Sequence, residues 1–300
     1  MQLSTLRFDT GNLELLARQV VEGFIIGLHK SPFHGFSVEF AEHRVYNAGD
    51  NLRHIDWKVF ARRDKMFVKK FEEETNLRCC IAIDTSRSMS FPETGLSKIQ
   101  FACLGAAAIM QLLRKQLDAA GLSLFAEQVY WSSPVKSSER HYKSLVVELE
   151  RLLAQPLTHT ATNLPKVLHE IAETAQQRSL VVVFSDFMDD ISREQEFYTA
   201  LQHLKFSKQE VIIFQVGDGK KEWDFEFENR PYEFIDLETQ ARIRLKPAEV
   251  KAQYLEALNA YHKRLEQQCL KFGIDLVRCD IHTDMAHILQ SYLIRRNKLM

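Results

Sequence analysis

The chain has 300 residues, of which 45% are hydrophobic and 26% charged, as is ordinary for a soluble globular protein. The formal net charge is −1, so no global field attracts nucleic acid or anionic lipid. No apolar run approaches the length of a membrane span, and Asp9 and Glu14 lie where a signal peptide would be basic and then apolar. The five cysteines form no CxxC pair, which favours neither a disulfide framework nor a zinc site. We therefore expect a soluble, cytoplasmic protein.

The N-terminal quarter combines one helical pattern with several strand-like ones. Residues 11–30 place apolar side chains on one helical face, at Leu13, Leu16, Val20, Phe24 and Leu28. The stretch GFSVEF then alternates apolar and polar residues, and DWKVFARR and KMFVKKFE are also typical of strands. These patterns predict a small N-terminal α+β lobe over residues 1–76.

From Leu77 onward, strands alternate with helices. The apolar runs predict strands over 77–84, 121–126 with a hairpin partner at 128–131, 179–185, 210–216 and 273–279. Helical patterns cover 97–117, 138–154, 163–176, 192–203, 247–271 and 284–298, one of them opened by a Ser192–Gln195 capping box. Continuous apolar strands such as LVVVF are typical of a parallel sheet covered on both faces. The pattern predicts an α/β domain over 77–300, a doubly wound, mostly parallel sheet with a β insertion at about 223–246 that turns at 229–231.

Hard oxygen donors follow the first strand of this domain. In CCIAIDTSRSMSF, residues 79–91, an apolar run ends on Asp84, and hydroxyls follow at Ser86 and Ser88. Residues at i, i+2 and i+4 can aim at one point where the chain curls, and such donors suit Mg²⁺, Mn²⁺ or Ca²⁺ rather than zinc. Two later loops at the same sheet edge carry similar donors, Thr160 or Thr162 in one and Asp186 in the other.

These motifs resemble those of a known family. DTSRS matches the DxSxS signature of the von Willebrand factor A domain and its metal-ion-dependent adhesion site, and ATNL and FSD resemble its second and third loops. The upstream stretch GFSVEFAEHRVYNAGDNLRHIDWKVFARRDKMFVKKFEEE resembles the segment that precedes this domain in the bacterial domain-of-unknown-function family number fifty-eight. Its structural signature residues here are Arg44, Tyr46, Gly49, Asp50, Arg53, Asp56 and Trp57. We expect Asp50 and Asp56 to pair with arginines and Trp57 to lie in a core.

The resemblance implies a non-catalytic protein-binding module that works with a MoxR-type AAA+ ATPase or its client. It implies a cation, Mg²⁺ with Mn²⁺ or Ca²⁺ as alternatives, which bridges to an Asp or Glu of the partner. Carried over to this chain, the ligands are Asp84, Ser86, Ser88, Thr162 and Asp186. The second loop reads Thr160-Ala161-Thr162 instead of GGT, which leaves two threonines open as the ligand. Many members carry membrane helices before this region, and this chain fits a soluble subtype better.

Two other functions are weighed against this one. A metal-dependent phosphohydrolase could use Asp84 as its nucleophile, but Ser86 lies where such enzymes place an acidic residue as general acid. The basic and aromatic residues of segment 53–70 could bind nucleic acid, but the acidic residues between them favour a structural role.

Overall fold

The computed structural model describes residues 12–25, 39–45, 57, 59–60, 66–72, 77–158, 161–188 and 193–299. The chain divides into two compact units, one formed by Met1–Pro32 with Arg78–Met300 and the other by Phe33–Leu77. These bounds differ from the predicted lobe of residues 1–76, because the first helix belongs to the larger unit.

The smaller unit contains an antiparallel pair of strands. β1 (Glu39–Val45) pairs with β2 (Phe67–Glu72) so that Val45 faces Phe67. The register shifts between Phe40 and Glu42, which marks a bulge in β1. The strand pattern of KMFVKKFE is thus confirmed, and the last two residues of GFSVEF open β1. The strand expected in DWKVFARR is wrong at its described residues, since Trp57, Val59 and Phe60 are helical.

The signature residues lie in or between these strands. Trp57 is 59% exposed and meets Phe60 edge-on, with ring centroids 6.1 Å apart. The expectation that Trp57 lies in a core is therefore wrong, because most of its surface stays exposed to solvent. Arg44 lies on β1. The remaining signature residues lie outside the described part of the chain: Tyr46, Gly49, Asp50, Arg53 and Asp56.

The larger unit contains the predicted alternation of strands and helices, with ends shifted by less than a helical turn. Its elements in chain order are α1 (Leu13–Ile25), β3 (Arg78–Asp84), the 3₁₀ turn η3 (Arg87–Ser90), α3 (Lys98–Lys115), β4 (Ala119–Phe125), β5 (Val129–Ser132), α4 (Glu139–Leu153), α5 (Leu164–Thr174), β6 (Leu180–Ser185), α6 (Glu194–Phe206), β7 (Glu210–Gly217), the π-helical turn η5 (Gly219–Trp223), β8 (Tyr232–Ile235), β9 (Arg242–Leu245), α7 (Pro247–Phe272), β10 (Asp275–Asp280) and α8 (Met285–Leu299).

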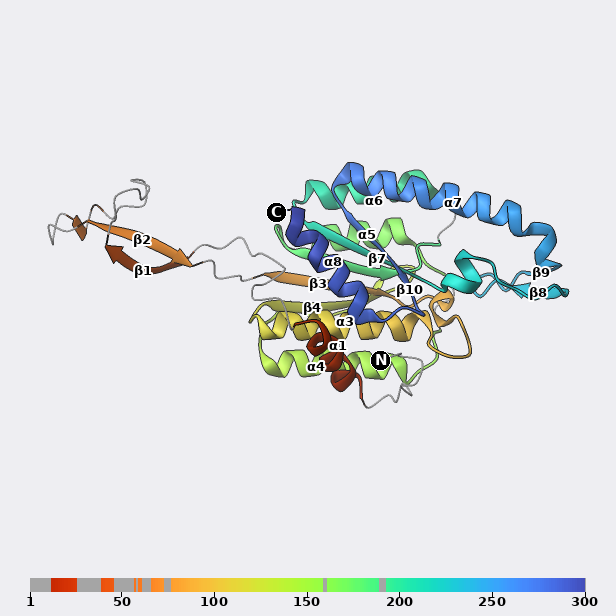
Figure 1. Cartoon of the computed structure of the whole chain (residues 1–300), viewed down its shortest axis with the longest axis horizontal. Helices are drawn as coiled ribbons and strands as arrows, with labels where there is room; N and C mark the ends of the chain where they lie inside the picture. The colour runs from red at the N-terminus through yellow and green to blue at the C-terminus, as the bar shows by residue number, and fades with distance from the viewer. Residues whose placement is uncertain are drawn as a thin grey trace. The chain divides into compact units, whose positions relative to one another are not determined.

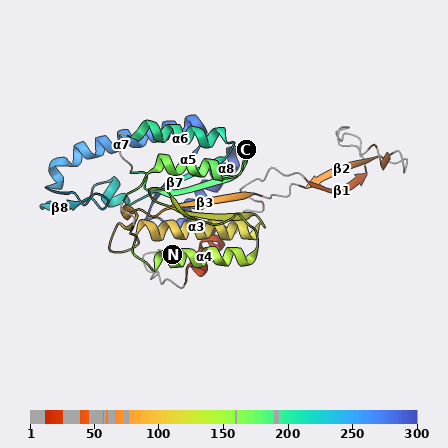
Figure 2. The ribbon, with the colours of Figure 1, turned by 180° about the vertical axis from the view of Figure 1, so that it is seen from behind.

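The strands form one sheet between two layers of helices. The strand order is β10-β7-β6-β3-β4-β5, and all pairs are parallel except that of β4 with the edge strand β5. Helices α1, α3, α4 and α8 cover one face, and α5, α6 and α7 cover the other (Figures 1 and 2). This is the predicted doubly wound sheet. None of the helices within the described ranges combines the length and apolar character needed to cross a bilayer.

Helix α1 packs on the larger unit through its apolar face. Leu13 and Val21 are 1% and 0% exposed, and the helix lies against α3 and α8. At its first turn, Glu14 accepts from Arg114 of α3 at 3.3 Å. The apolar stripe seen in the sequence is thus a core face of the sheet domain.

A capping box fixes the start of α3. The side chain of Ser97 accepts from the backbone N–H of Gln100, and the Gln100 side chain accepts from the backbone N–H of Ser97 at 2.9 Å. The capping box predicted at Ser192 involves a residue outside the described ranges, and Arg193 at the N-cap of α6 makes no side-chain cap. Directly inside the observed box lies Lys98, the first residue of α3.

The predicted β insertion lies between β7 and α7. It consists of η5 and of an antiparallel hairpin, β8 with β9, that does not join the main sheet. The chain bends at residues 229–230, within the predicted turn, while the hairpin itself turns at residues 236–241, where Asp236 caps the turn with its side chain and backbone.

All five cysteines are free thiols in this layered core. They lie in both strands and helices: Cys79 and Cys80 on β3, Cys103 on α3, Cys269 on α7 and Cys279 on β10. Burial raises the pKa of each thiol above its ordinary value.

Candidate metal centre

The candidate site lies where the strand order reverses. β3 leads through α3 to β4 on one side of it, while β6, on its other side, is reached through α5. Ligands of open α/β sheets bind in the crevice outside the carboxyl ends of the strands at such a point. Here β3 ends on Asp84 and β6 ends on Ser185, so both side chains lie at this crevice.

Asp84 is the centre of a buried cluster of hydroxyls. Its carboxylate accepts from the Ser86 backbone N–H at 2.9 Å, from Ser185 Oγ at 2.7 Å and from Thr162 Oγ1 at 3.2 Å. The Asp84 side chain is fully buried. Burial, and after it the charge of Asp186, raises the pKa of Asp84 to about 6. Among the residues that the structure describes, no basic side chain forms an ion pair with this buried carboxylate.

The remaining first-loop hydroxyls adjoin this carboxylate. Ser86 Oγ lies 3.0 Å from Ser88 Oγ. Ser86 is buried and Ser88 half-buried, on η3 or directly before it. The structure thus brings Asp84, Ser86, Ser88 and Thr162 together from two loops. Thr160, the other candidate of the second loop, lies outside the described residues.

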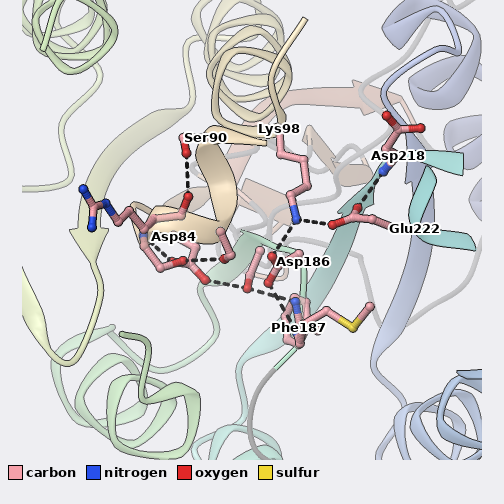
Figure 3. A network of polar contacts seen from close by, with 12 residues as sticks. Asp84, Ser90, Lys98, Asp186, Phe187, Asp218 and Glu222 are labelled. Atoms are coloured by element: carbon pink, nitrogen blue, oxygen red, sulfur yellow. Dashed lines mark hydrogen bonds and ion pairs between the residues drawn. The ribbon is translucent and has the colours of Figure 1, made fainter. Parts of the chain in front are cut away.

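Asp186, the third-loop acid, is paired with a lysine (Figure 3). Lys98 Nζ donates to Asp186 Oδ2 at 2.8 Å and to Glu222 Oε1 of η5 at 2.7 Å, and Lys98 is 1% exposed. Burial disfavours the charged forms of Lys98, Asp186 and Glu222. The charge of Lys98 nevertheless lowers the pKa of Asp186, while the two acids raise the pKa of Lys98. Glu222 keeps a raised pKa because burial and Asp186 outweigh Lys98.

Three residues of this site do not stand out in the sequence. Ser185 is the last residue of an apolar strand, and only its position before Asp186 could have pointed to it. Lys98 opens an apolar helix and Glu222 lies in the insertion, so their pairing depends on contacts between distant segments. No local pattern signals such an ion pair.

The donor set fits a hard divalent cation. Oxygens at neighbouring vertices of a Mg²⁺ octahedron, with bonds of about 2.0–2.1 Å, lie about 3 Å apart. The Ser86–Ser88 and Thr162–Asp84 oxygen pairs are 3.0 and 3.2 Å apart. Within the described ranges no group of three or more His, Cys, Asp or Glu side chains is arranged to hold a metal, so hydroxyls must complete the set.

A buried acceptor without a donor lies beside the same loop. Gln215, the register partner of Ser185 on β7, is 1% exposed, and its Nε2 lies 3.5 Å from the Asp186 carbonyl. Its Oε1 has no hydrogen-bond partner among the described residues. Such an atom calls for a donor, and water held by a cation is one kind of donor.

Several solved structures are similar to this chain. An aerotolerance-related membrane protein from Bacteroides fragilis, crystallised with multiple mutations to serine, is 18% identical, with a TM-score of 0.46 over 75% of this chain and 100% of that one. BatB from Bacteroides thetaiotaomicron is 15% identical, with a TM-score of 0.44 over 74% and 99%. The SpRpn10 VWA domain is 12% identical, with a TM-score of 0.38 over 71% and 93%. At these identities the likeness concerns the fold alone.

Relatives by sequence include three uncharacterized mycobacterial proteins, one from Mycobacterium bovis and two from strains of Mycobacterium tuberculosis. Each is 24% identical over 180 residues, which are 60% of this chain and 56% of the relative. The chain thus matches little more than half the length of these relatives. The family described as "Protein of unknown function DUF58" matches residues 42–264, well over half of the chain. The chain therefore belongs to this family.

Proposed function

We propose that this chain is a non-catalytic protein-binding module in which a divalent cation bridges to a carboxylate of a partner. One observation carries the proposal: hydroxyl oxygens of two loops lie within hydrogen-bonding distance of Asp84 or of one another, close enough to meet at one cation. The pairs are Ser86 with Ser88 at 3.0 Å and Thr162 with Asp84 at 3.2 Å. When bound, the cation, Mg²⁺ before Mn²⁺ or Ca²⁺, supplies the positive charge that a partner's carboxylate recognises.

Neighbouring residues fix the positions of the side chains of this site. Ser185 Oγ, which donates to Asp84 at 2.7 Å and accepts from the Phe187 backbone N–H at 3.1 Å, ties the third loop to the first. Lys98 balances the charge of Asp186, so this acid lies beside the cluster without adding a full uncompensated charge. Asp186 is thereby suited to an outer role through water, while Asp84 is the acid that anchors the cation.

The partner is proposed from the family resemblance. A MoxR-type AAA+ ATPase, or a client of that ATPase, would offer an Asp or Glu side chain to the site. The five free thiols agree with action in the reducing cytoplasm. The von Willebrand A-like fold gives the site an edge formed by loops at the carboxyl ends of the strands, where a partner can approach.

The geometry favours binding over nucleophilic chemistry. Both oxygens of Asp84 accept hydrogen bonds, and the side chain is fully buried. A nucleophile needs an oxygen that can reach the reacting atom. Ser86, two positions on, has no acidic proton of the kind that a phosphohydrolase uses for its leaving group.

The direct test is binding of the purified chain to a MoxR-type AAA+ ATPase of the same organism, measured with Mg²⁺ and with EDTA. Asp84→Ala is compared with Asp224→Ala, which removes an exposed carboxylate from the insertion. Circular dichroism and thermal unfolding establish that both variants fold.

We expect binding that requires both Mg²⁺ and Asp84 and that Asp224→Ala leaves unchanged. Binding that is indifferent to EDTA and to Asp84→Ala would overturn the cation-bridged mechanism. No binding to the ATPase under any condition would overturn the partner assignment.

A further inference from the structure

A buried lysine lies between the candidate metal centre and the β insertion. Lys98 Nζ lies 2.8 Å from Asp186 Oδ2 of the third loop and 2.7 Å from Glu222 Oε1 of the insertion, and the lysine side chain is 1% exposed. An ammonium group at this depth is favourable only with partners, and the two carboxylates are those partners. The network in Figure 3 thus joins three segments that lie far apart in the sequence.

Both carboxylate oxygens of Asp186 accept hydrogen bonds from the protein. Oδ2 accepts from Lys98, and Oδ1 accepts from the Met188 backbone N–H at 3.3 Å. The preceding residue, Ser185, donates to Asp84 at 2.7 Å, so Asp186 follows directly on a contact of the acid that anchors the site. A cation bonded directly to Asp186 would lie next to the ammonium group of Lys98, and two positive charges so close together repel each other.

Glu222, the second acid of Lys98, is fixed by contacts within and around the insertion. Its Oε2 accepts from the Asp218 backbone N–H at 2.8 Å, and its carbonyl oxygen accepts from the Tyr254 hydroxyl of α7 at 2.8 Å. The Asp218 side chain in turn accepts from two backbone N–H groups of η5, each at 3.0 Å. Glu222 therefore faces Lys98 from a turn whose geometry is fixed independently of the loops of the metal centre.

Lys98 and Glu222 act on the site with opposite charges. Within the described network, the carboxylates of Asp84, Asp186 and Glu222 are accompanied by one ammonium group, that of Lys98. Loss of the ammonium group would make the site more negative, and loss of the Glu222 carboxylate would make it less negative. A cation binds more tightly where the surrounding charge is more negative, so the two losses should shift the cation affinity in opposite directions.

We infer that Lys98 is a specificity-determining residue that keeps Asp186 from binding the cation directly, and that Glu222 is the positioning residue through which the insertion sets this effect. The inference rests on the proposed function, and it deepens it. A cation bound by Asp84 and neutral hydroxyls keeps most of its positive charge, and a partner's carboxylate is a ligand that this charge favours. Lys98 thus lowers the affinity for the cation and raises the affinity of the bound cation for an outside carboxylate.

Mn²⁺ is the probe for this inference, because its affinity and its bound water are both measurable on the full chain. Electron paramagnetic resonance gives the affinity, and water-proton relaxation gives the number of exchangeable waters. Lys98→Met removes the ammonium group, and Glu222→Gln removes the carboxylate of the insertion. The double variant loses one charge of each sign, and it decides the test if Lys98→Met alone does not fold. Lys115→Met on α3 and Glu226→Gln in the insertion are the controls, since both remove exposed charges.

We expect Lys98→Met and the double variant to bind Mn²⁺ about tenfold more tightly than the unmodified chain. Both should lose about one exchangeable water, because Asp186 is then free to take its place on the ion. Glu222→Gln should bind Mn²⁺ about tenfold more weakly, since the charge of Lys98 then acts on the site without its second acid. Neither quantity should change in the two controls.

Mn²⁺ binding in Lys98→Met and in the double variant that is no tighter than in Lys115→Met would overturn the role of Lys98. Weaker binding in all three site variants would mean that the network only supports the fold, and it would overturn the inference as well. Equal affinities of Glu222→Gln and Glu226→Gln would overturn the role of Glu222. If Asp84→Ala still abolished Mn²⁺ binding in these cases, the proposed function would stand. Failure of the unmodified chain to bind Mn²⁺ would overturn both.

Discussion

Lys98 Nζ lies 2.8 Å from Asp186 Oδ2, and the two side chains are only 1% and 8% exposed. The capping box at Ser97 fixes the first turn of α3, and the carboxyl end of β6 presents Asp186 to it. The negative charge of Asp186, the third-loop acid, is therefore already compensated by Lys98. Asp84, in contrast, forms no ion pair with any of the described residues.

Lys98→Met is expected to lower the free energy of unfolding by about 3–5 kcal/mol, because it leaves Asp186 and Glu222 buried without their cation. Urea denaturation measures the change. Lys166→Met is the control, since Lys166 is half exposed and its ion pair with Glu170 is 4.0 Å long. Equal stability of the two variants would show that the buried group of Lys98, Asp186 and Glu222 is not held together by charge.

Thr162→Val is expected to weaken Mn²⁺ binding about tenfold, because it removes the second-loop hydroxyl next to Asp84 while it keeps the branched shape of the side chain. Thr162→Ser keeps the hydroxyl and should bind like the unmodified chain. Thr199→Val, on α6 and outside the site, controls for the loss of a threonine hydroxyl. Unchanged affinity in Thr162→Val would remove the second loop from the ligand set and point to another donor.

His262 is expected to make the protein sensitive to acid. Its side chain is 6% exposed, and burial, with a smaller effect from Arg278, lowers its pKa to about 4. Because the unfolded chain binds the proton at about pH 6.5 and the folded chain only near pH 4, stability present above pH 6.5 is lost as pH falls between these values. The loss is about 2–3 kcal/mol.

His262→Phe should remove this part of the pH dependence while it keeps a ring against Trp223, whose centroid is 6.2 Å away. Urea denaturation at pH 7 and at pH 4 provides the comparison. The same loss of stability in both proteins would assign the acid sensitivity to other groups.

Gly105→Ala is expected to destabilise the protein by about 1–2 kcal/mol, because strain in a full core outweighs the better helix propensity of alanine. A Cβ at this position of α3 would lie 2.8 Å from Met285 Cε and 2.9 Å from Phe184 Cε1. Thermal unfolding gives the size of the effect. Combination with Met285→Ala should cost less than the sum of the two single changes, and strict additivity would contradict the clash.

The sequence predicted the sheet domain well because its strands are local apolar runs. β6 is buried along its length and β3 from Ile81 to Asp84, so their patterns needed no knowledge of tertiary contacts. The cluster of Asp84, Ser86, Ser88 and Thr162 followed from the same logic, since parallel strands end at one edge. Whether these residues bind a cation stays a prediction.

The misplaced features all depend on long-range contacts. α1 has an apolar face that would suit either unit, and only its packing on α3 assigns it to the larger one. Lys98 resembles an ordinary first-turn lysine until Asp186 and Glu222 are brought to it. Trp57 is a large aromatic residue of a type that is usually buried, yet it is mostly exposed. Segment 53–70, the alternative nucleic-acid surface, lies largely outside the described ranges, so that alternative is neither confirmed nor wrong.

The five thiols, four of them buried and that of Cys80 half-buried, can report on the opening of the unmodified chain. A thiol reagent attacks thiolates, and burial suppresses the thiolate form at every one of these positions while the fold is intact. The rate at which each cysteine is labelled therefore measures how often the structure around that cysteine unfolds locally. Cys80 lies four residues before Asp84 on the central strand β3, while Cys269 lies on α7, in the helical layer that α7 forms with α5 and α6. Peptide mapping of the labelled protein would reveal whether an occupied site slows the opening of the central strand alone or of the whole domain.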